Sequence, residues 1–338
     1  MSRKPGAPAW RGAYPRCVSV TLRGLTRADI PAWSSLLADV ELVERSGEHY
    51  NEADLHEELD DPAVTEGLDF LGAFDADRLV GYACVRARDV ATEVHKVAME
   101  GAVHPDRRGE GIGTMLAAAM FERAQTAHAE TFPDATGYYS FRGLSSNTAQ
   151  ENLMAGIGLA PERWSFAMRA DLRQVEPASE LPDGLLVKVY DASMADALRL
   201  AHNDAFRDHP NSSLWSESMW KQWVTDSRSF RPDDTFVAVD PAQRDRIVAY
   251  VQTNEHDANF AATGKREAYV GKVGTLREHR GKGIASTLLR HCLAAYQVAG
   301  YDEASLDVDS ANPTGALGVY ERAGFEMESR WTDYSMLR

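Results

Sequence analysis

The chain has 338 residues, of which 44% are hydrophobic and 26% charged, and its formal net charge is −15. This length allows two domains that each bury a core. The negative charge argues against nucleic acids and anionic membranes as partners and favours a neutral or cationic small molecule. No run approaches ~18 consecutive apolar residues, so no membrane span is expected. The three cysteines show no metal-ligand spacing, so we expect no metal and a reduced, cytoplasmic protein.

The first half of the chain alternates strand and helix patterns behind a polar leader. Residues 1–15 are rich in Pro, Gly and Ala, lack an apolar core and are expected to be disordered. A first domain is expected over residues 16–172. Its elements follow in chain order as strand 18–22, helices 29–45 and 51–59, strands 70–74, 79–86 and 94–103, helix 115–127, strand 137–142, helix 148–156 and a closing strand that ends near Leu172.

A linker is expected at 173–184, where Pro and Gly interrupt every periodicity. Residues 185–338 then form a second domain with a similar order of elements. These are strand 185–189, helices 192–206 and 216–227, strands 235–239, 247–252 and 268–275, helix 287–299, strand 303–308, helix 314–323 and a closing strand that ends near Leu337. Each half contains one strand–helix–strand crossover, so we predict α/β domains with mixed sheets rather than all-parallel ones.

A short glycine-rich phrase occurs twice and marks the two halves as copies. It reads RGEGIGT at 108–114 and RGKGIAS at 280–286. Each copy follows a strand pattern and opens a helix pattern, so unpaired backbone N–H groups and the positive end of a helix dipole point at one spot. Such a cradle suits a pyrophosphate. Asn147 and Asn312 each precede a Gly-(Leu/Phe) pair and an Arg-Trp pair, which supports a duplicated unit of about 165 residues.

The pattern Arg-x-x-Gly-x-(Gly/Ala), between a strand and a helix, resembles the acetyl-coenzyme A signature of the GNAT superfamily of N-acetyltransferases. Val103-His104-Pro105 precedes the first copy as in that family, and Tyr320 and Gly324 follow the second at family-like spacing. The resemblance covers essentially the whole chain as a tandem of two GNAT-like acyl-CoA N-acyltransferase domains. A Rossmann dinucleotide site is the competing interpretation, but neither copy has its G-x-G-x-x-G spacing.

The resemblance implies acetyl-CoA as the cosubstrate, with its pyrophosphate on the loop amides and its pantetheine arm paired with the preceding strand. An amide near Thr275 or Leu276 can donate to the thioester oxygen as it becomes an oxyanion, and losing such a donor costs roughly 3 kcal/mol in other enzymes. The residues implied in cofactor binding are Val103, Arg108, Gly109, Gly111, Gly113, Thr114, Thr275, Leu276, Arg280, Gly281, Gly283, Ala285, Ser286 and Asn312.

Tyr320 lies four residues before Gly324, where the family usually carries a tyrosine beside the coenzyme sulfur. A phenol with a pKa near ~10 can donate to a thiolate whose thiol has a pKa near ~8.5. The equivalent residue of the first half is Met154, which cannot donate a proton. We therefore predict that the chemistry takes place in the C-terminal domain and that the N-terminal domain is a structural or regulatory copy.

The sequence offers several candidates for the general base. Glu267, on the strand before the second loop, is selected here, although the usual carboxylate position of the family is Tyr269 in this chain. The other candidates are Glu255, His256, Asp257 and His209 in the C-terminal half, and His95 and Glu100 in the N-terminal half. No cysteine lies where an acyl-enzyme would need one, so direct transfer in a ternary complex is predicted over a ping-pong reaction.

We therefore expect an enzyme, a monomer or homodimer, that acetylates a primary amine of a small molecule. In layout the chain is similar to two-domain members of the superfamily such as mycothiol synthase, which acetylates a cysteinyl amine. Aminoglycoside-type acetyltransferases are a second implied class. A non-catalytic acyl-CoA-binding or scaffold protein is the alternative from a different class. The acceptor amine, the base and the occupancy of the N-terminal cradle stay open.

Overall fold

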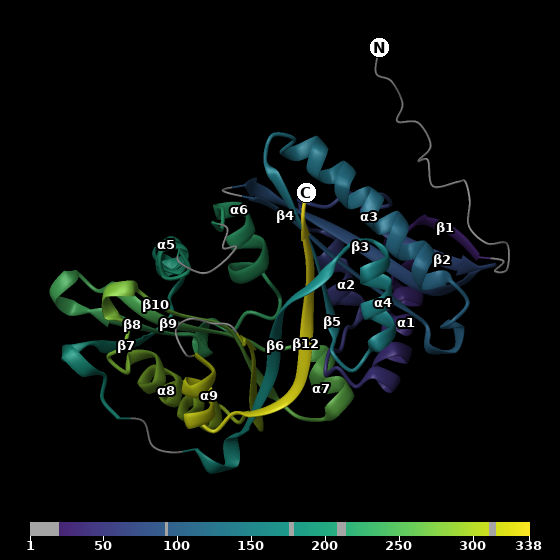
Figure 1. Ribbon diagram of the computed structural model, residues 1–338. Coiled ribbons are helices and arrows are strands. Elements are labelled where there is room, and N and C mark those ends of the chain that lie inside the picture. Colours follow the sequence, from purple (N-terminus) through teal and green to yellow (C-terminus); the bar gives the residue numbers. More distant parts are fainter. Residues whose placement is uncertain (1–19, 92–93, 176–178, 208–213, 311–315) are drawn as a thin grey trace.

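The computed structural model describes residues 20–91, 94–175, 179–207, 214–310 and 316–338, so the expected leader lies outside the described residues. Within them, twelve strands form one continuous sheet through the whole molecule (Figure 1). The strands are β1 (Val20–Gly24), β2 (Phe70–Asp75), β3 (Arg78–Ala91), β4 (Val94–Val103), β5 (Thr136–Leu144), β6 (Ala160–Asp171), β7 (Leu186–Val189), β8 (Phe236–Asp240), β9 (Arg246–Asn254), β10 (Glu267–Thr275), β11 (Glu303–Asp309) and β12 (Glu326–Leu337). The helices are α1 (Ile30–Glu44), α2 (Glu52–Leu59), α3 (Ile112–Thr131), α4 (Thr148–Gly156), α5 (Ala195–Ala205), α6 (Glu217–Trp220), α7 (Asp257–Thr263), α8 (Ile284–Val298) and α9 (Ala316–Arg322).

The sheet is mixed, as the single crossover in each half predicts. Neighbouring strands follow the order β1-β2-β3-β4-β5-β12-β6-β11-β10-β9-β8-β7. The pairs β4–β5 and β10–β11 are parallel and are joined through α3 and α8, whereas the other pairs are antiparallel. The two crossovers occupy equivalent places in the two halves, which agrees with a duplicated unit.

The two closing strands are exchanged between the halves. We expected β6 to complete the first domain and β12 the second. Instead β12 pairs with β5, and β6 pairs with β11, while β6 and β12 pair with each other at the centre of the molecule (Figure 1). Met168 and Ala170 of β6 accordingly join the core of the C-terminal half, and Tyr334 of β12 joins that of the N-terminal half. Because the two halves are duplicates, the free edge of β5 and the free edge of β11 are equivalent. Each closing strand can therefore form the same backbone hydrogen bonds with the other half as it would with its own.

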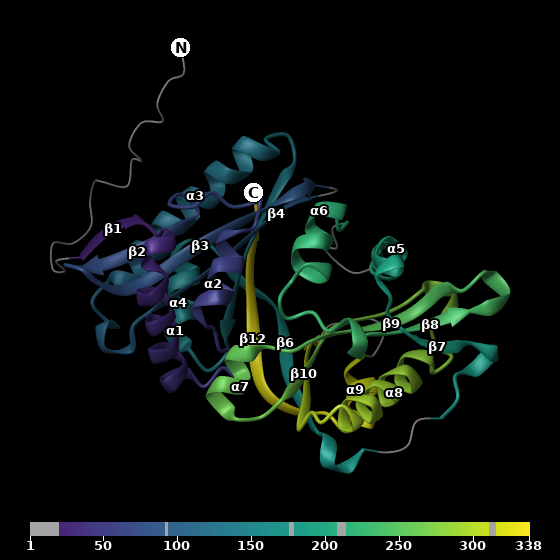
Figure 2. The same cartoon turned by 180° about the vertical axis from the view of Figure 1, so that it is seen from behind.

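Helices cover both faces of the sheet in each half (Figure 2). In the N-terminal half α3 and α4 pack on one apolar face and α1 and α2 on the other. In the C-terminal half α8 and α9 occupy one face, and α5 and α6 the other. The short helix α7, between β9 and β10, was not predicted. None of the helices in the described part of the chain combines the length and apolarity that crossing a membrane requires.

Candidate active site

Glycines with a left-handed backbone form both cradles. Gly111 and Gly283 directly precede α3 and α8 and have φ values of +85° and +79°. Gly109 and Gly281 have φ values of +81° and +75°. Residues with a side chain rarely adopt this conformation. A Cβ added at any of the four would meet no atom within 4 Å. The first amides of α3 and α8 therefore adjoin open space in which a phosphate can accept their hydrogen bonds.

Arg108 and Arg280 tie each cradle to its own half in the same way. Arg108 Nε donates to the Val103 carbonyl at 3.1 Å, and Arg280 Nε donates to the Thr275 carbonyl at 3.2 Å. The far side of each guanidinium reaches the first long helix of its half. Arg108 Nη2 lies 2.6 Å from Glu44 Oε1, and Arg280 Nη2 lies 2.5 Å from the Ala205 carbonyl oxygen. Both side chains thus support the loops, and their direct contact with a cofactor stays a prediction.

The strand before each cradle diverges from its parallel neighbour. β4 pairs with β5 only as far as Met99, and β10 pairs with β11 only as far as Tyr269. In the N-terminal half the resulting gap belongs to a groove with a volume of about 490 Å³. The predicted residues that line it are Val103, Arg108, Gly109, Gly111, Gly113 and Thr114. In the C-terminal half Ala285 and Ser286 lie in the first turn of α8, and Asn312 lies outside the described residues.

The backbone hydrogen bonds decide which amides can face the gap. The Leu276 amide donates to the Val248 carbonyl at 2.9 Å, and Leu276 itself is 2% exposed. Amides alternate sides along a strand, so the Thr275 amide points away from β9 and toward the gap. Of the two amides proposed as oxyanion donors, the structure excludes that of Leu276, because β9 already uses it.

Two further cavities lie where the halves meet. The first chamber has a volume of about 300 Å³ and the second about 290 Å³. The first chamber shares with the N-terminal groove the residues Glu44, Tyr82, Gly101, Ala102, Phe141 and Gln150. Both chambers share Ser46, Glu48, Tyr50 and Trp331. Residues 46–50 of the N-terminal half and Trp331 of β12 therefore lie between the first chamber, beside β4, and the second chamber, beside β10.

Comparison with known proteins identifies the family. The model of the acetyltransferase (GNAT) family matches residues 32–141 and 195–325, one match in each half. The chain belongs to the GNAT family. Mycothiol acetyltransferase of Thermobispora bispora is 32% identical over 276 residues, which cover 80% of this chain and 84% of that protein. Mycothiol acetyltransferase of Streptomyces griseus is 32% identical over 254 residues, which cover 73% of each protein.

Solved structures agree with this result. The crystal structure of a GCN5-related N-acetyltransferase from Sphaerobacter thermophilus matches with a TM-score of 0.75 and 26% identity, over 96% of this chain and 97% of that one. A tandem GNAT protein from the clavulanic acid biosynthesis pathway has the same fold, with a TM-score of 0.68 and 17% identity over 94% and 98%. The chain is thus an acetyl-CoA-dependent acetyltransferase built from two tandem GNAT domains.

Among the described residues, no group of three or more His, Cys, Asp and Glu side chains is placed to hold a metal ion.

Tyr320 lies on α9 in the core of the C-terminal half, and only 9% of it is exposed. Burial raises the pKa of its phenol to about 12, so the hydroxyl keeps its proton at neutral pH. Met154, the equivalent residue on α4, lines the N-terminal groove. A position of Tyr320 beside the coenzyme and its role as an acid both stay predictions.

The sequence analysis missed a buried pair beside Thr275. Tyr250 Oη lies 2.6 Å from His202 Nδ1, and the Tyr250 ring occupies the space where a Cβ of Gly274 would be. Burial lowers the pKa of His202 to about 3, with a smaller contribution from Lys272, so the imidazole is neutral at physiological pH. Tyr82 occupies the same register position opposite β4. This repeated tyrosine was the signal that could have revealed the pair.

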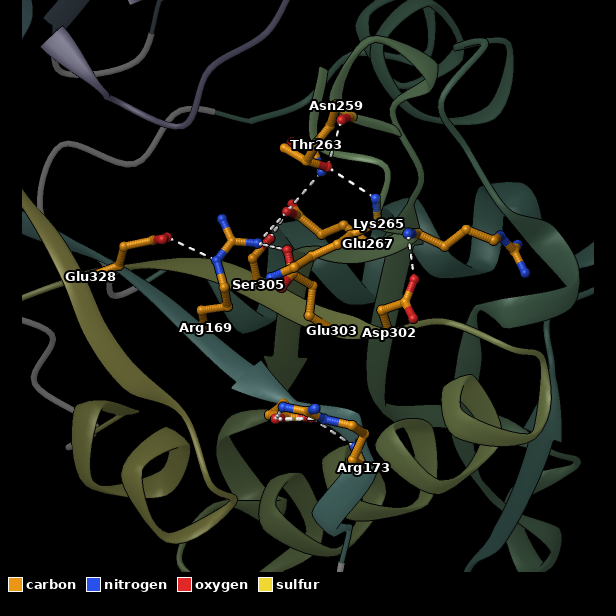
Figure 3. Close-up of polar contacts among 12 residues, drawn as sticks. Arg169, Arg173, Asn259, Thr263, Lys265, Glu267, Asp302, Glu303, Ser305 and Glu328 are labelled. Atoms are coloured by element: carbon orange, nitrogen blue, oxygen red, sulfur yellow. Dashed lines mark hydrogen bonds and ion pairs between the residues drawn. The ribbon is translucent and has the colours of Figure 1, made fainter. Parts of the chain in front are cut away.

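Glu267 is held on several sides, as Figure 3 shows. Its carboxylate accepts hydrogen bonds from Arg169 Nη1 and Ser305 Oγ, each at 2.5 Å, and from Asn259 Nδ2 at 3.0 Å. Arg169 also pairs with Glu303 at 2.5 Å, so the network ties β6 to β10 and β11. These donors occupy both oxygens of the Glu267 carboxylate. These contacts favour a structural role for Glu267, and its function as the base stays a prediction.

Of the other candidate bases, His256 lies at the second chamber, and the rest are engaged, exposed or outside the described residues. Glu255 pairs with Arg231 at 3.0 Å and with Arg266 at 2.9 Å. Glu100 accepts hydrogen bonds from Tyr82 and Arg86, and Asp257 lies near Arg228. His95 is fully buried against His128, and His256 lines the second chamber. His209 lies outside the described residues.

Proposed function

We propose that this protein transfers the acetyl group of acetyl-CoA to a primary amine of a small molecule, with the chemistry in the C-terminal domain. The assignment of the chemistry to the C-terminal domain is supported by a difference between the halves in the residue at one equivalent position. Tyr320 provides a hydroxyl there in the C-terminal domain, whereas Met154 provides none in the N-terminal domain.

In this proposal the pantetheine arm lies along the unpaired side of β10, with the pyrophosphate on the amides before and within the first turn of α8. The Thr275 amide stabilises the oxygen of the thioester as the amine nitrogen attacks its carbonyl carbon. The carbon–sulfur bond then breaks, and Tyr320 donates its proton to the departing thiolate. The attacking nitrogen releases its proton to water, and the phenolate recovers a proton from water, so the products are the acetamide and the free thiol of coenzyme A.

Direct attack is supported by the state of the described cysteines. Cys84 and Cys292 are fully buried, and burial raises the pKa of both thiols. A buried thiol with a raised pKa is a poor nucleophile. Neither can form an acyl-enzyme, so we favour a ternary complex.

The relatives named mycothiol acetyltransferases make a cysteinyl amine on a sugar conjugate one substrate to test, and amino-sugars are another. We expect the protein to be cytoplasmic and to be a monomer or a homodimer. Sedimentation analysis of the purified protein distinguishes the two states of assembly. The acidic surface agrees with a cationic acceptor.

Thiol release from acetyl-CoA, measured over a panel of amines with wild-type protein and the Tyr320→Phe variant, tests the proposal. We expect at least one amine to give release, and the variant to bind acetyl-CoA normally while release slows about 100-fold. Binding of acetyl-CoA without release from any amine would instead support a non-catalytic coenzyme-binding protein.

A further inference from the structure

The strand before the second cradle contains one extra residue. The register of β9 and β10 shifts by one residue between Val270 and Lys272, so Gly271 has no opposing residue on β9 and forms a β-bulge. The pairing of β10 with β11 ends shortly before it, at Tyr269. A bulge bends its strand and disrupts the ladder locally, and bulges often lie beside active sites. This one marks the point where β10 leaves β11.

The matching stretch of β4, all of which the structure describes, has no bulge. The two halves can be aligned on one backbone hydrogen bond at the end of each strand. The Leu276 amide donates to the Val248 carbonyl at 2.9 Å, and the His104 amide donates to the Val80 carbonyl at 3.0 Å. Counted back from there, residues 97–103 of β4 pair with β3 in one unbroken register. The bulge therefore distinguishes the C-terminal acetyl path from the N-terminal one.

The side-chain amide of Gln252 packs against the bulge from β9. Its Nε2 donates to Asn254 Oδ1 at 2.6 Å and to the Thr253 carbonyl at 3.2 Å. These bonds turn Oε1 toward Gly271, where an added Cβ would lie 2.6 Å from that oxygen. Gly271 does not have a left-handed backbone, so glycine is needed here for space and not for its φ.

Stability alone does not account for Gln252. The residue is 1% exposed, and its Oε1 has no hydrogen-bond partner among the described residues. A buried amide oxygen without a partner destabilises a fold. In the first half the equivalent residue is Cys84, which lies opposite Glu100 as Gln252 lies opposite Lys272. The polar side chain thus accompanies the bulge and is absent where the strand is regular.

The position of the bulge decides which amides of β10 are free. Because the Leu276 amide faces β9, alternation directs the Val273 and Thr275 amides into the gap. A bulge that moved toward the cradle would reverse the alternation behind it and turn the Val273 amide to β9. Strands rich in glycine specify their register weakly. Gly271 and Gly274 make this stretch such a strand, so its register needs a lock.

We propose that Gln252 is a positioning residue of the C-terminal acetyl path. Its side-chain amide locks the bulge at Gly271 and so fixes the direction of the free amides that follow. It acts through the backbone of β10 and not by contact with the reactants. The inference rests on the proposed function for the identity of this path, but the lock itself does not require acetyl transfer.

A double-mutant cycle on thiol release tests the lock. Gly271→Ala places a methyl group where the Gln252 amide lies and displaces it, and Gln252→Ala removes it. Each change should lower kcat about tenfold with little change in acetyl-CoA affinity, because the free amides are misdirected. The double variant should also lose about tenfold, since both changes act through the same lock. Urea titration establishes that each variant is folded.

Hydrogen exchange of single amides, followed by NMR without acetyl-CoA, separates positioning from general destabilisation. In the wild type the Lys272 and Gly274 amides face β9 and should exchange slowly, whereas the Val273 and Thr275 amides should exchange rapidly. Gln252→Ala should reduce this contrast about tenfold or more, whereas general destabilisation would speed exchange throughout the sheet. Cys84→Ala, at the equivalent place in the first half, is the matched control and should keep both the contrast and kcat.

Unchanged kcat in either single variant, a loss of about a hundredfold in the double variant, or an unchanged exchange contrast in Gln252→Ala would overturn the inference. If the wild type releases thiol with no amine, a reduced contrast in Gln252→Ala supports the lock while the proposed function fails. Thiol release by the wild type, with an unchanged contrast in that variant, keeps the proposed function and refutes the lock.

Discussion

Gly283→Glu is the sharpest test of the proposed division between the domains. Gly283 precedes α8 with a φ of +79°, and its equivalent Gly111 precedes α3 with a φ of +85°. A side chain at either position has open space around its Cβ. The substitution therefore adds a carboxylate in front of the cradle without displacing any atom of the protein.

Two effects add in this variant. The left-handed backbone costs about 1–2 kcal/mol of stability for a residue other than glycine. A carboxylate about 4 Å from one phosphate charge costs about 1 kcal/mol in water and about 4 kcal/mol in a surface environment of lower dielectric constant. An intermediate value of about 2 kcal/mol weakens acetyl-CoA binding to that cradle roughly 30-fold. Gly283→Ala has the same backbone strain without the charge, so it should lose stability but keep its affinity for acetyl-CoA.

Thiol release and calorimetry with acetyl-CoA are the assays. We expect two acetyl-CoA sites in the wild type and one strong site in each glutamate variant. Gly283→Glu should lose the release of thiol with the amine that the wild type uses, whereas Gly111→Glu should keep most of it. An equal loss of release in both variants would refute the assignment of chemistry to the C-terminal domain.

Three further substitutions probe the same site. Tyr320→Phe should lower kcat about 100-fold with little change in acetyl-CoA affinity, measured by thiol release and calorimetry; unchanged kcat would exclude Tyr320 as the acid. Glu267→Gln should weaken the network around Arg169 and lower the free energy of unfolding by about 1–3 kcal/mol, measured by urea titration; the acidic limb of the pH–rate profile should persist, and its disappearance would identify Glu267 as the base. Tyr250→Phe removes the hydroxyl partner of the buried His202 and should cost about 1–3 kcal/mol of stability in the same titration; an unchanged midpoint would show that water replaces the hydroxyl.

The sequence predicted the order of the elements and the two cradles well, because both are local. The phrases 108–114 and 280–286 specify positive φ at glycines and a helix start, and these need no long-range contact. The family and the fold followed from the same phrases. Most strands were recognisable as short runs rich in apolar and β-branched residues, since helices cover both faces of the sheet.

The exchange of β6 and β12 could not be predicted from the sequence. Both closing strands present apolar residues on a face and follow equivalent helices, so alternation fits either partner equally. The role of Glu267 was hidden for a similar reason. Its partner Arg169 lies 98 residues earlier, on a strand that the sequence assigns to the other half. Glu48 and Asp333 line the first chamber together because β12 crosses into the first half.

The crossing of β12 also determines when, during synthesis of the chain, the sheet of the first half can be completed. The ribosome delivers residues 326–337 after the other strands of the described sheet, and until then β12 is missing from its place between β5 and β6. Two exposed strand edges of this kind invite pairing with other nascent chains. Cutting the gene between the halves would therefore not yield two independent enzymes, since each piece would retain a strand that belongs to the sheet of the other.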